Sequence, residues 1–300
     1  MRGNRQKFGR GFTLLELIVV VGIISVVFAL ILAGVQRARS AADRIKCLNR
    51  LKQLALALHQ HDSSQGQLPP GHRSPIVTEK LPYTGWPLSI LPYLEQESLY
   101  SVALQDFQRQ RNPLLGHAGF TFPLSSFLCP TDARGATPQR SKRSNLVAAY
   151  TSYQGVSGLN CQTRDGMLIP DGKIRLVDAQ DGLSNTLLLG ERPVSHDFEF
   201  SWWYAGNGQD GHGSLEQIMG VRELNLLVIE QGSSCGPGQY PFIAASGVSD
   251  PCGQFHFWSL HSGGGHFAFV DGSVRFMAYS ANSILPALAS RSGGETQIVE

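Results

Sequence analysis

The chain has 300 residues, of which 42% are hydrophobic, so it is long and apolar enough for one large domain or two small ones. Its 33 glycines, 16 prolines and only 16% charged residues favour a turn-rich body containing β-structure over a helical bundle. The net charge of +2 includes four cations in residues 1–11, and without them 21 basic residues stand against 23 acidic ones. The charge therefore gives no reason to expect a nucleic-acid partner.

The N-terminus combines a basic segment with a long apolar run, because residues 17–35 carry no charge. Apolar runs of 18 or more residues are typical of membrane-spanning helices, whereas cleavable signals have apolar cores of ~7–15 residues that end at a small-residue site. Here the small residue, Gly11, precedes the apolar run, so cleavage after it would leave the helix on the mature protein. We therefore predict a leader peptide at 1–11 and a transmembrane helix at 12–35.

Residues 36–61 are predicted to continue this helix as an amphipathic segment. Apolar residues recur in steps of three and four, which places them on one helical face with the cations opposite. The stripe consists of Ala38, Ala41, Ala42, Ile45, Leu48, Leu51, Leu54, Ala55 and Leu58. The basic face could contact a membrane or nucleic acid, but a solvated face is the interpretation that we favour. The stripe needs a cover, which a sheet formed by residues 62–300 would supply.

Within residues 62–300, the clearest helical segment is 86–100, interrupted by Pro92, and short strands are expected at 146–156 and 186–189. The strongest β signal lies near the C-terminus, where two alternating runs at 266–270 and 273–277 flank Asp271-Gly272. Asp-Gly favours a two-residue hairpin turn in which both residues have positive φ.

Residues 193–255 differ from the rest because they are rich in glycine and aromatic residues and only weakly periodic. We predict an insertion here with an exposed surface. Trp202, Trp203 and Tyr204 could form a stacking platform for a sugar or polymer, although packing in the core is the interpretation that we favour.

The five cysteines are compatible with a location outside the cytoplasm, where disulfides persist. Cys235 and Cys252 bracket a loop rich in Gly, Pro and Ser and are our candidate disulfide; alternatively, the cysteines are small buried hydrophobes or free thiols. An odd number leaves at least one cysteine unpaired within the chain. No pair has the Cys-x-x-Cys spacing of a zinc or redox site, so we expect no metal.

The N-terminal motif Gly11-Phe12-Thr13-Leu14-Leu15-Glu16, after a basic leader and before an apolar helix, resembles that of type IV prepilins and pseudopilins. The resemblance implies cleavage between Gly11 and Phe12 by a prepilin peptidase, N-methylation of Phe12, and pairing of Glu16 with the Phe12 amine of a neighbouring subunit. A carboxylate near a bilayer is costly and is by default functional. The alternative is that Glu16 reaches water at the membrane boundary.

A second resemblance is to a large bacterial family of prepilin-like proteins of unassigned function that end in a motif of His, nine residues and Asp-Gly. Here this motif is formed by His261, Asp271 and Gly272. Two residues depart from the family pattern: Arg50, where Asn is usual, and His266, where Asn or Ala is common. The other matching stretches are 47–54, 91–96, 127–130, 181–186 and 293–295.

The histidines of this region, His256, His261 and His266, recur every five residues without the close pair typical of helical or finger-like metal sites. We favour a structural interpretation in which His261 holds a loop by hydrogen bonds and Asp271 serves the turn. A nucleophile elbow, a phosphate loop and a metalloprotease helix are all absent from the sequence. We therefore expect neither an enzyme nor a bound cofactor.

Together, the sequence and the resemblance predict an α+β, pilin-like fold, with a long N-terminal helix, half transmembrane and half amphipathic, packed on an antiparallel sheet with large loops. The expected function is a non-catalytic subunit or minor component of a type IV pilus or type II secretion-like fibre. Expected partners are a prepilin peptidase, other pilin-like subunits and the bacterial inner membrane.

The resemblance implies a single pass with the N-terminus in the cytoplasm, although cations beyond the span oppose this orientation. The alternative function is a membrane-tethered binding module that presents residues 193–255 to a glycan or small solute.

Overall fold

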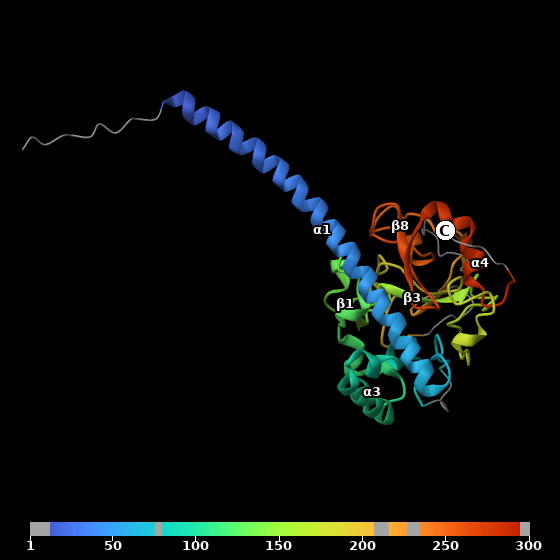
Figure 1. Ribbon diagram of the computed structural model, residues 1–300. Helices are drawn as coiled ribbons and strands as arrows, with labels where there is room; N and C mark the ends of the chain where they lie inside the picture. The colour runs from blue at the N-terminus through green and yellow to red at the C-terminus, as the bar shows by residue number, and fades with distance from the viewer. Residues whose placement is uncertain (1–12, 76–79, 207–215, 227–234, 295–300) are drawn as a thin grey trace, which may run out of the picture. The chain divides into compact units, whose positions relative to one another are not determined.

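The computed structural model describes residues 13–75, 80–206, 216–226 and 235–294, and it divides into two compact units, Met1–Asp43 and Arg44–Glu300 (Figure 1). The helix α1, Leu14–Gln65, runs through the division, so its two parts are described separately. We refer to the unit that begins at Arg44 as the head.

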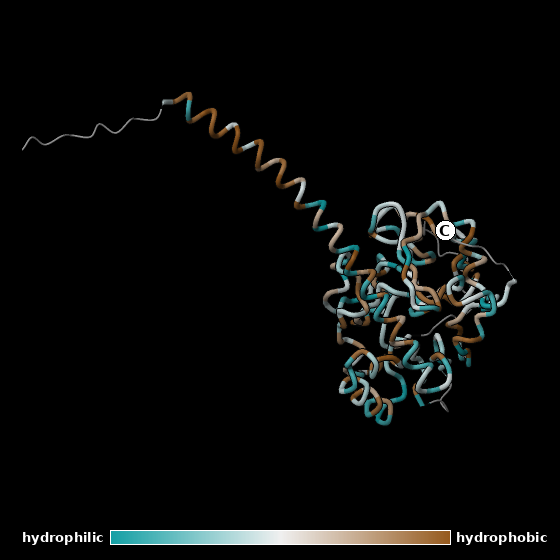
Figure 2. Tube along the Cα trace, viewed as in Figure 1, coloured by the Kyte–Doolittle hydropathy of each residue, from teal (hydrophilic) through white to brown (hydrophobic). Residues whose placement is uncertain are grey.

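The described part of the first unit is residues 13–43, and Figure 2 shows most of it as an almost continuous hydrophobic stretch of α1. An 18-residue window of this helix has a mean hydropathy of 3.1, and none of the window is buried. Large apolar side chains are exposed all along it, from Leu14 at 76% to Val35 at 54%. A helix that is apolar on every side is stable only when lipid or protein covers it. This part of the chain therefore fits a single-pass membrane anchor.

The head is built on a five-stranded sheet with the order β5-β3-β4-β8-β9. Neighbouring strands are antiparallel except for β3 and β5, which are parallel. The strands are β3 Tyr153–Gly158, β4 Leu187–Glu191, β5 Ile218–Gly220, β8 Gly264–Phe269 and β9 Val274–Ala278. The predicted α+β class with a long N-terminal helix is confirmed, and the sheet is mixed rather than wholly antiparallel.

From Cys47 onward, α1 packs in the core of the head, and it ends at Gln65, four residues beyond the predicted end. Its buried residues are Cys47, Leu51, Leu54, Ala55, Ala57 and Leu58. The Tyr153 hydroxyl on β3 donates a hydrogen bond to the Cys47 carbonyl at 3.1 Å, which ties the helix to the sheet. The prediction was wrong for Ile45, which belongs to the predicted stripe but is 58% exposed, because burial begins only at Cys47.

The basic side chains on this part of α1 do not form the purely solvated face that we expected. The Arg44 guanidinium lies 3.5 Å from the centroid of the Phe276 ring, while Arg50 donates to the Leu128 carbonyl and Lys52 to the Gly272 carbonyl. These cations instead attach the helix to three separate loops or strands of the head.

The segment predicted as one interrupted helix at 86–100 is broken as Pro92 requires, into α2 Trp86–Ser89, the 3-10 helix η1 Leu91–Leu94 and α3 Glu97–Arg109. Near the C-terminus lies α4 Leu285–Ala289. Two small sheets pair β1 Gln139–Arg140 with β2 Val147–Ala148 and β6 Glu223–Asn225 with β7 Gly238–Tyr240. Single 3-10 turns are η2 Pro113–Leu115, η3 Ala118–Thr121, η4 Ser125–Phe127, η5 Ala133–Gly135, η6 Leu176–Asp178, η7 Pro251–Gln254 and η8 Tyr279–Ser283.

The described part of 193–255 contributes to the core of the head. Its strand β5 is an edge strand of the central sheet, and residues 193–206 are mostly buried. Trp202, Trp203 and Tyr204 are only 3%, 0% and 0% exposed, and Trp203 stacks on Phe127 with ring centroids 5.3 Å apart. The favoured core-packing interpretation is confirmed, and these rings cannot serve as a stacking platform. Our expectation of an exposed surface was wrong for residues 193–206, whereas residues 236–250 are mostly exposed or half-buried.

The closing hairpin forms between β8 and β9 as predicted, but its turn differs. Only Gly272 of the Asp-Gly pair has a positive φ, 79°. The Gly272 N–H donates to the Phe269 carbonyl at 2.9 Å, and the Phe269 N–H donates to the Ser273 carbonyl at 2.9 Å. This is a three-residue connection in which a glycine in the left-handed region follows a tight turn, so Asp271 avoids the strain of a positive φ.

Candidate functional site

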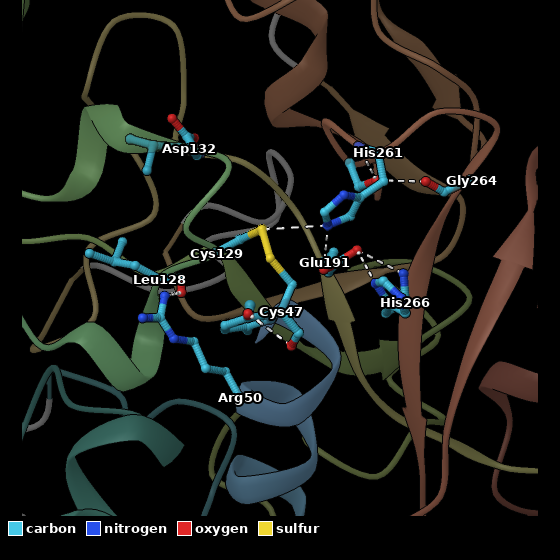
Figure 3. Close-up of a disulfide and its surroundings, with 12 residues drawn as sticks. Cys47, Arg50, Leu128, Cys129, Asp132, Glu191, His261, Gly264 and His266 are labelled. Carbon is cyan, nitrogen blue, oxygen red and sulfur yellow. Dashed lines mark hydrogen bonds and ion pairs between the residues drawn. A yellow bond between two sulfur atoms is a disulfide. The ribbon is translucent and has the colours of Figure 1, made fainter. Parts of the chain in front are cut away.

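Four side chains from distant parts of the chain meet in the interior of the head (Figure 3). Cys47 comes from α1, Cys129 from the loop after η4, Glu191 from the end of β4, and His261 from the loop before β8. Each is at most 7% exposed, and one ligand-type atom from each lies within 4.8 Å of the others. This cluster, Cys47, Cys129, Glu191 and His261, is the candidate site.

Cys47 and Cys129 form a disulfide across 82 positions of sequence. The sequence analysis did not pair them, because a helical and a loop cysteine this far apart give no local spacing signal. One clue was available: each cysteine lies in a stretch that carries the family resemblance, and so does His261. In the folded chain these three stretches meet at one buried point.

Glu191 is the charged centre of the cluster. Its Oε2 accepts hydrogen bonds from the His266 backbone N–H at 2.8 Å and from His266 Nδ1 at 3.1 Å, and its Oε1 lies 3.6 Å from His261 Nε2. Burial raises the pKa of this carboxyl, but its interactions with the rings of His261 and His266 outweigh burial and leave the pKa well below its usual value. Glu191 is therefore held as a carboxylate.

A small cavity adjoins the disulfide and Glu191. Its volume is about 10 Å³, close to the minimum for one water, and its lining includes Cys129, Ser152 and Ser259. Two buried polar atoms beside it, Glu191 Oε1 and Ser152 Oγ, lack hydrogen-bond partners. Buried polar atoms are nearly always paired, so these two mark a place where a polar ligand would be stabilised.

The residues of the His-x9-Asp-Gly motif do not meet. His261 lies before strand β8, and Asp271 and Gly272 lie in the turn after it. His261 lies in the cluster, with its Nε2 3.6 Å from Cys129 Sγ. Its backbone N–H donates to Ser259 Oγ at 3.0 Å, while Asp271 Oδ1 accepts the Ser273 N–H at 2.7 Å. The Asp271 side chain thus bonds within the turn, whereas the loop bond of His261 comes from its backbone, and the roles expected for the two side chains stay predictions.

At its far end the motif contacts α1. Lys52 Nζ donates to the Gly272 carbonyl, and His59 Nε2 lies 2.7 Å from the Val270 carbonyl. Of the other histidines, His266 joins the cluster, with its ring centroid 5.3 Å from that of His261, whereas His256 bonds to the Phe257 carbonyl. The motif thus connects the central helix to the cluster.

The remaining cysteines form a second, separate region. Cys235 and Cys252, the pair proposed from the sequence, are joined by a disulfide, and Cys161 is free and buried. Burial and the nearby carboxylate of Glu223 raise the pKa of the Cys161 thiol to about 12, so it is protonated and unreactive.

At the other end of the chain, Gly11 and Phe12, the predicted processing site, lie outside the described residues. Glu16 is described, and its Oε2 accepts the Thr13 N–H and the Thr13 hydroxyl, each at 2.9 Å, while the Glu16 N–H donates to Thr13 Oγ1 at 3.2 Å. This reciprocal pattern is a capping box that begins α1. The sequence analysis did not foresee this role, although the spacing Thr-x-x-Glu is its usual signal.

The fold and the cluster define a class of protein: an α+β head with a disulfide-linked core, carried on a helix that fits a membrane anchor. A family model described as "Protein of unknown function (DUF1559)" matches residues 36–283, and the chain belongs to this family. The predicted relationship to the family with the His-x9-Asp-Gly motif is thereby confirmed. Neither the curated proteins nor the solved structures contain a match.

Proposed function

We propose that this chain is a prepilin-like envelope protein, a non-catalytic subunit or minor component of a type IV pilus or type II secretion-like fibre. In this proposal a prepilin peptidase cleaves between Gly11 and Phe12 and the new amine is methylated. The apolar part of α1 holds the protein in the bacterial inner membrane and later packs against the same helix of other subunits. The head lies outside the cytoplasm.

The observation that carries the proposal is the exposed, uncharged apolar stretch of α1 from Leu17 to Val35, which belongs to the same helix as the residues from Cys47 onward that form part of the head's core. Such an apolar helix can pack against the same helix of other subunits as well as against lipid. The two disulfides favour an oxidising compartment for the head.

Substitutions at Glu16 and Thr13 test assembly most directly, because together they separate the charge of Glu16 from its role in the capping box. Glu16→Gln keeps an acceptor for the Thr13 N–H but removes the charge that would pair with a neighbour's amine. We expect Glu16→Gln and Glu16→Ala to be cleaved largely like wild type and to be strongly depleted from sheared fibres. Mass spectrometry of the mature N-terminus measures cleavage and methylation, and immunoblots of the fibre fraction measure incorporation.

Thr13→Ala is the matched control, because it removes the cap and keeps the charge. It should be incorporated at close to the wild-type level. Normal incorporation of Glu16→Gln would contradict the proposed pairing, and incorporation lost equally in Thr13→Ala would assign Glu16 to helix capping instead.

The alternative function, a membrane-tethered binding module for a glycan or small solute, loses its proposed stacking platform because Trp202, Trp203 and Tyr204 are buried. Extraction separates the two functions. Fibre-sized assemblies support the pilin-like function, whereas detergent-soluble monomers with affinity for a glycan or solute support the binding module.

A further inference from the structure

We propose that Cys47, Cys129, His261 and Glu191 form a four-ligand zinc site when the disulfide between the two cysteines is reduced. The site would then have two states: an oxidised state closed by the sulfur–sulfur bond, and a reduced state able to bind one divalent ion. The inference concerns the interior of the head and does not depend on whether the chain assembles into fibres.

The spacing of the donor atoms fits tetrahedral zinc. Bonds of ~2.3 Å to sulfur and ~2.0–2.2 Å to nitrogen or oxygen place neighbouring ligand atoms roughly 3.3–3.8 Å apart. His261 Nε2 already lies 3.6 Å from Cys129 Sγ and 3.6 Å from Glu191 Oε1. The bonded sulfurs lie closer than a tetrahedron allows, and breaking their bond lets them move apart.

The surroundings of Glu191 prepare one oxygen for a ligand. His266 occupies Oε2 with two hydrogen bonds, which fixes the carboxylate and leaves Oε1 buried without a hydrogen-bond partner. Outer contacts of this kind orient ligands in metal sites. The small cavity is lined by Glu191 and Cys129, two of the four proposed ligands, and so adjoins the site.

Reduction balances as a thiol–disulfide exchange. An external dithiol gives up two electrons and two protons and becomes a disulfide, while the Cys47–Cys129 bond breaks into two thiols. When zinc binds, both thiols lose their protons to solvent. Two thiolates, one carboxylate and one neutral imidazole around Zn²⁺ carry a net charge of −1, far less repulsive than three buried anions without a metal.

The donor set favours zinc over harder cations. Calcium and magnesium prefer sites made of oxygen ligands, whereas thiolate and imidazole suit zinc. No metal was expected from the sequence, because no two cysteines have the Cys-x-x-Cys spacing and His256, His261 and His266 lack the close pair typical of helical or finger-like metal sites. The four ligands instead come from residues 47, 129, 191 and 261, which only the fold brings together.

The experiment uses the full chain in detergent, prepared in oxidised form and in dithiol-reduced, desalted form, and titrated with Co²⁺ as a spectroscopic probe. We expect the reduced protein to bind one Co²⁺ per chain with thiolate-to-cobalt charge-transfer bands and visible bands of a tetrahedral site, and Zn²⁺ to displace it. The oxidised protein should show neither. A reduced protein without these bands would overturn the proposal.

Two variants assign the ligands. Cys235→Ala/Cys252→Ala removes the other disulfide and should bind Co²⁺ like wild type, whereas His261→Ala should bind more than about 100-fold more weakly, a larger loss than is typical of an outer-shell residue. Unchanged affinity in His261→Ala, or lost binding in the double variant, would place the metal elsewhere. Near-ultraviolet circular dichroism without metal checks that each variant is folded.

A measurement on wild type alone covers the case in which His261→Ala does not fold. Zn²⁺ should slow alkylation of Cys47 and Cys129 in the reduced protein by at least tenfold, as followed by peptide mass spectrometry, and leave Cys235 and Cys252 unprotected. Equal alkylation rates with and without Zn²⁺ would overturn the proposal.

Discussion

The two disulfides of the head are chemically the same bond in very different places. Cys47–Cys129 spans 82 positions, joins α1 to a loop in the core, and lies beside a buried carboxylate and two histidines. Cys235–Cys252 spans 17 positions and closes a loop in which Gly236, Gly238 and Gly247 face open space. The first organises the core and the second holds a local loop.

The difference in loop length between the two disulfides predicts the largest effect on the free energy of unfolding. Opening a loop of about 82 residues costs about 4.5 kcal/mol in the chain-entropy account, against about 3 kcal/mol for about 17 residues. Cys47→Ala/Cys129→Ala should therefore lose more unfolding free energy than Cys235→Ala/Cys252→Ala. Urea unfolding of the full chain in detergent, followed by tryptophan fluorescence, measures both. Equal losses, or a larger loss for the second pair, would show that the comparison fails.

The Cys235–Cys252 pairing was proposed from the sequence and the Cys47–Cys129 pairing was not, for a physical reason. A short Gly- and Pro-rich loop between two cysteines is a local signal, as is the Asp271-Gly272 hairpin. The pairing of Cys47 with Cys129 depends on how α1 lies against β3, which local patterns do not encode. The same limit applies to Glu191: the three leucines and one glycine before it mark a strand, but nothing local indicates its histidine partners.

The apolar helix and the α+β class could be predicted because hydrophobic periodicity determines them. The residue at which α1 becomes buried could not be predicted from the sequence. Ile45 and Leu51 follow the same apolar pattern, and only the extent of the head determines that Leu51 is buried while Ile45 is exposed. The mixed sheet could not be predicted from the sequence either, because the parallel pairing of β3 and β5 joins strands separated by about sixty residues.

The second prediction compares how much two carboxylates contribute to stability: Glu191 beside Cys47–Cys129 and Asp250 beside Cys235–Cys252. Glu191→Gln should destabilise the protein by roughly 3 kcal/mol at pH 7, because it removes a buried charge that His261 and His266 face. The native pKa of Glu191 is lowered, so its contribution is present above its ordinary pKa of 4.5 and is lost as pH falls toward the native pKa. The variant should therefore show a weaker loss of stability in acid. Unfolding curves from pH 7 to pH 3 measure this.

Asp250→Asn is the control in the other region. Asp250 Oδ1 accepts the Cys252 N–H at 2.9 Å at the start of η7, and Asn can accept the same bond. Asp250 Oδ2 also accepts the Ser246 N–H, a bond that Asn cannot make through its amide nitrogen, so the loss at pH 7 should be about 1 kcal/mol, well below that of Glu191→Gln. A loss as large as that of Glu191→Gln would mean that burial does not distinguish the two carboxylates.

The smallest expected effect tests the turn that joins the His-x9-Asp-Gly motif to α1. A Cβ on Gly272 would lie 3.6 Å from His59 Nε2 and 3.7 Å from Lys52 Nζ, which are ordinary contacts, so the cost of Gly272→Ala comes from its positive φ of 79°. A left-handed conformation costs a residue with a Cβ about 1–2 kcal/mol.

Gly236→Ala in the Cys235–Cys252 loop is the matched control. Its Cβ would meet no atom within 4 Å and its φ lies outside the left-handed range, so we expect no loss of stability there. If both variants unfold at the wild-type urea concentration, the turn at Gly272 has relaxed and its contact with α1 contributes little. If only Gly272→Ala is destabilised, the turn requires a residue without a Cβ at this left-handed position, and that turn contacts α1 on one side and leads back along β8 to His261 on the other.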